Sequence, residues 1–89
     1  MKHAGEKALD ELSRLIEQIR RLPGLTERSL GSFYIRGVGF LHFHEDPAGM
    51  FADLKMANGA WERMRSTSAR EQAALMRLVR KELRARGIM

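Results

Sequence analysis

The chain contains no cysteine, so neither disulfide bonds nor thiolate metal ligands can form. No apolar run approaches the roughly 20 residues that a membrane-spanning helix needs, so we expect no membrane partner. The first residues lack the unbroken apolar stretch of a signal peptide, which favours a cytoplasmic protein. Complete motifs for a catalytic nucleophile or a phosphate-binding glycine loop are also missing, so we predict no catalytic residues.

What the chain does contain is charge, unevenly distributed. Its 89 residues are 44% hydrophobic and 30% charged, which is typical of a single globular domain covering residues 1–89. The net charge is +5, yet residues 1–54 carry 7 basic and 8 acidic side chains, whereas residues 55–89 carry 9 basic and 3 acidic ones. A basic C-terminal third attracts phosphates or an acidic partner.

Two segments have the spacing of amphipathic helices. Residues 4–22 place Leu12, Leu15 and Ile19 on one stripe, and Pro23-Gly24 ends the segment. In the second segment, Ser68 and Glu71 match the capping box that opens a helix, and Gly87 is a C-cap glycine. The buried stripe predicted for this second helix consists of Gln72, Leu75, Met76, Val79 and Leu83.

Between the helices the hydrophobic period changes to two, which predicts strands. Residues 30–44 form a hairpin with a three-residue loop at 36–38, and residues 50–56 form a third strand. We expect residues 25–29 to be a loop, and residues 60–65 to be either a short extra strand or an irregular segment. The predicted fold is α+β, in the order α-β-β-β-α: a three-stranded antiparallel meander packed on one face by two helices.

The predicted register divides the strand residues between two faces. Phe33, Ile35, Leu41 and Phe43 share the face beneath the helices. The other face carries Tyr34, Phe40, His42, His44, Phe51, Asp53 and Lys55. This second face is too apolar to be left in water. We therefore expect a homodimer whose interface includes Tyr34, Phe40 and Phe51.

The histidines on this second face leave two interpretations open. His42 and His44 alternate on one strand, and Asp53 on the adjacent strand supplies a carboxylate. Two imidazoles with a carboxylate suit a divalent metal such as zinc, the only cofactor that the sequence suggests. The alternative is a pair of structural or pH-sensitive histidines.

The last predicted helix carries a basic patch formed by Arg77, Arg80, Lys81 and Arg84. Such a patch neutralises phosphates, or it is simply a solvated helix face.

From the uncovered sheet face, we predict a small binding domain that acts as a homodimer. The alternatives are a basic protein that associates with nucleic acid, and a metal or small-ligand site at the His-x-His strand.

A family resemblance rests on three short motifs: Gly37–His44, which ends in His-x-His; Ala52-Asp53-Leu54; and Val79–Leu83, which closes at Gly87. This pattern resembles a small bacterial family labelled luciferase-domain proteins, a label that does not establish light-producing activity. The resemblance implies an α+β fold without an assigned reaction. It also singles out His42, His44 and Asp53.

Overall fold

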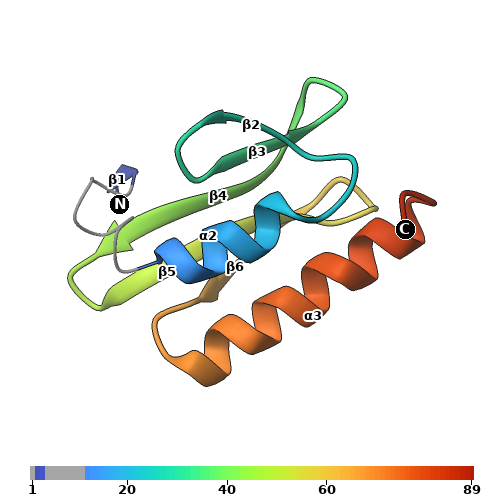
Figure 1. Ribbon diagram of the computed structural model, residues 1–89. Coiled ribbons are helices and arrows are strands. Elements are labelled where there is room, and N and C mark those ends of the chain that lie inside the picture. Colours follow the sequence, from blue (N-terminus) through green and yellow to red (C-terminus); the bar gives the residue numbers. More distant parts are fainter. Residues whose placement is uncertain (1, 4–11) are drawn as a thin grey trace.

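The computed structural model of the protein describes residues 2–3 and 12–89. It has the α+β class that the sequence predicts, with two helices and an antiparallel sheet in the described residues (Figure 1). The elements are β1 (Lys2–His3), α2 (Ser13–Arg20), β2 (Thr26–Ser29), β3 (Ser32–Ile35), β4 (Val38–Asp46), β5 (Gly49–Lys55), β6 (Trp61–Arg65) and α3 (Ala69–Ala85).

The sheet has more strands than the sequence predicts. Five strands follow one another in the order β2-β3-β4-β5-β6, and the two-residue β1 pairs with β4. The expected three-stranded meander corresponds to β3, β4 and β5. Residues 25–29 are not a loop, because they contain β2, and residues 60–65 contain the extra strand β6. Both additional strands are polar and largely exposed, so they lack the apolar alternation that marks a half-buried strand.

The β3–β4 hairpin corrects the predicted loop. The strands join through a two-residue turn, Arg36-Gly37, in which both residues have positive φ (51° and 82°), as a type I′ turn requires. Ile35 pairs with Val38 and Tyr34 with Gly39, but Phe33 pairs with Leu41. Phe40 is therefore the extra residue of a β-bulge. Beyond the bulge the register equals the one that a three-residue loop predicts.

The bulge moves Phe40 from the uncovered face into the core, so its assignment to the interface was wrong. Its side chain is fully buried, at 0% exposure. The Arg86 guanidinium lies 5.0 Å from the centre of the Phe40 ring, and Arg86 Nη2 donates a 2.7 Å hydrogen bond to the Lys55 carbonyl. An extra residue in one strand allows neighbouring side chains to turn to the same side, which a regular alternation forbids.

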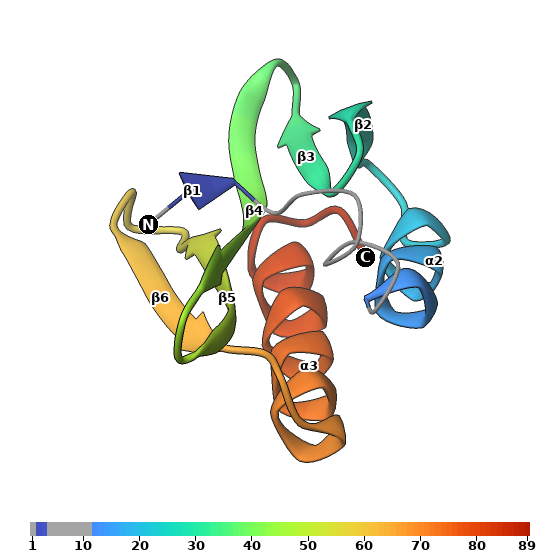
Figure 2. The same ribbon diagram turned by 90° about the vertical axis from the view of Figure 1, so that its left-hand side faces the viewer.

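Both helices cover the same face of the sheet (Figure 2). Of the predicted helix over residues 4–22, residues 4–11 lie outside the described residues, and the helical part is α2. The buried residues of this layer come from the two helices and from the inward positions of the strands: Leu12, Leu15, Ile16, Ile19, Phe33, Ile35, Phe40, Leu41, Phe43, Met50, Ala52, Leu54, Leu75, Met76, Val79 and Leu83. No helix in the described ranges is long and apolar enough to cross a membrane.

The ends of α3 are as predicted, and its acidic residues have structural partners. Ser68 Oγ accepts a hydrogen bond from the Glu71 amide, and Glu71 Oε1 accepts one from the Ser68 amide, which completes the capping box. The Ser68 amide holds the pKa of Glu71 below its ordinary value. Glu82 is buried and accepts a 2.7 Å hydrogen bond from the Ala57 amide. Gly87 follows the helix with φ of 75°.

Candidate functional site

The face of the sheet away from the helices carries rings and charges from five strands. The pairings Phe51–Arg65, Asp53–Arg63 and Lys55–Trp61 place the outward residues of β5 and β6 side by side. The residues on this face are Arg28, Tyr34, His42, His44, Phe51, Asp53, Lys55, Trp61, Arg63 and Arg65. Trp61 is 47% exposed, and Tyr34 and Phe51 are half-buried. The sequence therefore placed Tyr34 and Phe51 correctly on the face opposite the two described helices.

Five of these side chains form a continuous row across the face, which we call the ring–cation row: Arg28, Tyr34, His42, Trp61 and Lys55. The Arg28 guanidinium lies 4.7 Å from the centre of the Tyr34 ring. The Tyr34 and His42 rings meet edge to face at 5.7 Å, and the His42 and Trp61 rings lie 5.5 Å apart. Lys55 Nζ closes the row, 5.7 Å from the Trp61 ring. The predicted face already included Lys55 of β5, whereas Arg28 and Trp61 were not predicted there and are added by β2 and β6.

Gly39 gives the rings room to lie against β4. A Cβ at this position would lie 3.0 Å from His42 Nε2 and within 3.7 Å of two carbons of the Trp61 indole. Glycine in a strand often marks such a close approach. The glycine at position 39 therefore allows the rings of the ring–cation row to lie close to the backbone. The sequence contains this glycine, but the hydrophobic alternation of the strand does not explain it.

Asp53 is the charged centre of this face. Its carboxylate accepts hydrogen bonds from Arg63 Nε and Nη2 at 2.7 and 3.0 Å, and His44 Nε2 lies 2.7 Å from Oδ2. The Arg63 hydrogen bonds hold the pKa of Asp53 below its ordinary value against the opposing effect of burial, and the His44 charge adds to the lowering. The predicted link between His44 and Asp53 is therefore present, with Arg63 as an unforeseen third member.

The metal interpretation meets an obstacle in this arrangement. His42 pairs with Asp53 across the strands and lines an open hollow with His44, Asp53 and Trp61. However, Arg63 uses both carboxylate oxygens of Asp53, and the described part of the chain contains no group of three His, Asp or Glu residues placed to hold a metal. The structure thus brings the three predicted residues together around one hollow, in which Asp53 is paired with His44 and Arg63.

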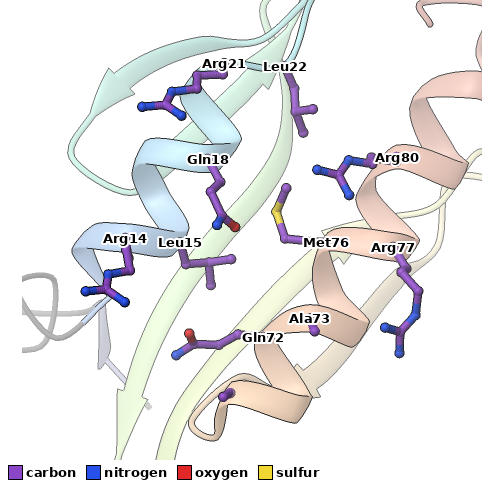
Figure 3. A pocket seen from close by; sticks show the side chains of 11 residues that line it. Arg14, Leu15, Gln18, Arg21, Leu22, Gln72, Ala73, Met76, Arg77 and Arg80 are labelled. Carbon is purple, nitrogen blue, oxygen red and sulfur yellow. The ribbon is translucent and has the colours of Figure 1, made fainter.

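The helix side of the molecule carries the predicted basic patch. Arg77, Arg80, Lys81 and Arg84 are all exposed on α3. Arg77 and Arg80 also line a groove between α2 and α3, together with Arg14 of α2 and Arg21, the C-cap of that helix (Figure 3). Lys81 and Arg84 do not line it. The contribution of α2 was not predicted, because only tertiary packing brings the two helices together.

Two surfaces of different chemistry therefore lie on opposite sides of the sheet. One presents rings with a cation at each end, and the other presents arginines between two helices. Comparison of the chain with protein-family models, with curated proteins and with solved structures found no match.

Proposed function

We propose that this protein is a small, non-catalytic binding module that takes single-stranded nucleic acid on its uncovered sheet face. The ring–cation row carries the proposal: three neighbouring rings cross the face, with Arg28 at one end and Lys55 at the other. Unpaired bases stack on such rings, and the adjacent cations attract the phosphates of the same strand.

The charges on this face support an anionic partner. In the described residues, Arg28 and Lys55 have no acidic partner, whereas Arg63 is paired with Asp53 and Arg65 with Glu71. Two uncompensated cations that contact a single strand give a slope of about −1.4 in a plot of log K against log salt concentration. The net charge of +5 adds a general attraction for polyanions.

The exposure of the rings favours single strands over duplexes on this face. Trp61 is the only tryptophan of the chain and is 47% exposed, so its indole is accessible to a base. Each stacked base contributes about 1–3 kcal/mol to binding. A duplex keeps its bases stacked on one another, so it offers the row only phosphates.

The lone tryptophan also provides the test. We expect mixed-sequence RNA or DNA single strands of about 12 nucleotides to quench Trp61 fluorescence in a saturable way. RNA and DNA are titrated separately, because the row itself does not select between the two sugars. The affinity should fall between about 50 and 200 mM salt, and Lys55→Gln should flatten the salt slope by about 0.7. An emission spectrum that no single strand changes at the lowest salt would refute the proposal.

Self-association across the same face is the second candidate, and Phe51 favours it. This ring is half-buried beside His44, on the face that neither α2 nor α3 covers. A face-to-face dimer would, however, bring Arg28 and Lys55 of both copies into one interface. Added salt should therefore strengthen a dimer of this kind and weaken nucleic-acid binding. Sedimentation at low and high salt separates the two: a dimer that tightens with salt indicates self-association, and a monomer at both salt concentrations contradicts it.

A further inference from the structure

The groove between α2 and α3 collects arginines from two directions. Arg14 and Arg21 come from the α2 side, and Arg77 and Arg80 come from α3. Figure 3 shows Arg80 and Gln18 pointing into the space between the helices, while Arg14, Arg21 and Arg77 stand further out. The complete lining is Arg14, Leu15, Gln18, Arg21, Leu22, Ala69, Gln72, Ala73, Met76, Arg77 and Arg80, which includes no acidic residue.

Acidic partners are found outside the groove and not in it. Arg20 of α2 points elsewhere and binds both Glu17 and Glu27, and its hydrogen bond to Glu27 raises the pKa of Arg20. By contrast, none of the four groove arginines has an ion pair with any residue that the structure describes. The acids of α3 cannot neutralise the groove, because the capping box uses Glu71 and the Ala57 amide uses Glu82.

The floor of the groove argues against an apolar occupant. Leu15 and Met76 are already buried, at 3% and 4% exposure, so a docking apolar helix would gain little contact area from them. The accessible lining consists of the guanidinium groups on long, exposed side chains, the Gln18 amide, the small side chains of Ala69 and Ala73, and the half-buried Leu22 and Gln72. Arginine forks match phosphate oxygens, so these side chains suit an anionic backbone.

From this placement we infer that the groove is a second nucleic-acid site, one that binds the phosphate backbone without contacting bases. The groove and the ring–cation row lie on opposite sides of the sheet. One molecule therefore holds two nucleic-acid segments at once, a single strand on the sheet and a backbone, such as that of a duplex, in the groove. The bridging half of this inference rests on the function proposed above, whereas the groove site stands without it.

Binding of a duplex tests the groove with little contribution from the sheet, because paired bases cannot stack on the rings and the row offers a duplex only its two end cations. We expect the wild-type protein to bind a blunt duplex in fluorescence anisotropy at about 50 mM salt. The double variant Arg77→Glu/Arg80→Glu should bind more weakly and lower the magnitude of the salt slope by about 1.8. The matched control is Arg70→Glu/Lys81→Glu, which makes the same charge change at exposed positions of α3 that do not line the groove. Equal losses in the two variants would show a general charge effect and overturn the groove site.

Bridging is measured by capture. A single strand is fixed to a surface, and a fluorescent duplex of unrelated sequence is added with the protein. We expect capture by the wild type and by the control, but not by Arg77→Glu/Arg80→Glu or by Trp61→Ala. Sedimentation of the complex should give one protein per pair of nucleic acids, and two protein copies per pair would contradict the inference.

The remaining outcomes separate this inference from the proposed function. Single-strand binding without duplex binding overturns the groove site and leaves the sheet function intact. Duplex binding without single-strand binding overturns the sheet function and bridging, and it supports the groove. Polyglutamate or anionic vesicles that displace the duplex at equal charge would show that the groove does not distinguish phosphodiesters, which overturns its assignment to nucleic acid.

Discussion

Truncation of Trp61 is the perturbation that the proposed function predicts most sharply. The indole contacts the His42 ring at 5.5 Å and Lys55 Nζ at 5.7 Å, and about half of it is exposed. Trp61→Ala removes a stacking surface worth about 1–3 kcal/mol per base. Because 1.4 kcal/mol corresponds to a factor of ten, the affinity for a single strand should fall by about 5- to 150-fold. The two end cations remain, so the salt slope should change little.

The assay is fluorescence anisotropy of a labelled single strand, since the variant lacks the intrinsic reporter. Leu30→Ala is the matched control, because Leu30 is also a large exposed apolar side chain (53%) but lies in the β2–β3 turn, outside the row. Thermal unfolding monitors the fold of both variants. If Trp61→Ala binds within twofold of Leu30→Ala while remaining folded, stacking on this face is refuted.

Three further predictions concern the residues that support the site. Gly39→Ala should weaken single-strand binding, because the new Cβ would lie 3.0 Å from His42 Nε2 and displace the rings. The loss should be smaller than that of Trp61→Ala, and the far-ultraviolet circular dichroism spectrum should stay unchanged. Asp53→Asn should lower the melting temperature at neutral pH. The pKa of Asp53 in the folded protein lies below the unfolded value of about 3.9. The stabilisation by the ionised Asp53 carboxylate is therefore complete above that value and is lost as the pH falls through the folded pKa. The difference from the wild type should therefore narrow in melts recorded below about pH 4. Glu82→Leu should lower the free energy of unfolding by about 1–2 kcal/mol in urea denaturation, whereas Glu82→Gln retains an acceptor for Ala57 and should lose less; equal losses would contradict the hydrogen-bond explanation.

The helices and the central strands were predictable because local signals and burial agree there. Ser68 and Glu71 form the capping box that their spacing indicates, and Leu75, Val79 and Leu83 are fully buried on one stripe. Regular alternation likewise identified most of the strands later seen as β3, β4 and β5. In these segments the position of a residue in the hydrophobic pattern is enough to predict whether its side chain is buried.

The edge strands and the bulge were not predictable for a different reason. β2 and β6 are polar and exposed, so backbone pairing with a neighbour, rather than an apolar face, makes them strands. The bulge at Phe40 places two consecutive large side chains, Phe40 and Leu41, in the core. Period-two alternation cannot express this arrangement. The error matters for function, because it transferred a buried ring to the predicted interface.

The candidate site was predictable only in part. Strand register brought His44 and Asp53 together as expected, because they lie on adjacent strands of one hairpin. Arg63 and Trp61 joined them through β6, whose pairing the sequence left open. Arg14 and Arg21 are separated in sequence from Arg77 and Arg80 by the strands β2 to β6. Only the packing of both helices on one face makes them neighbours.

The most direct measurement is a nuclear magnetic resonance titration of the protein labelled with ¹⁵N, in which the single tryptophan gives one indole N–H resonance. On addition of a single-stranded oligonucleotide at moderate salt, the Trp61 indole resonance and the backbone amides of Tyr34 and Lys55 should shift together and saturate. If the indole resonance stays in place while only the amides of α3 shift, the uncovered sheet face does not bind single-stranded nucleic acid.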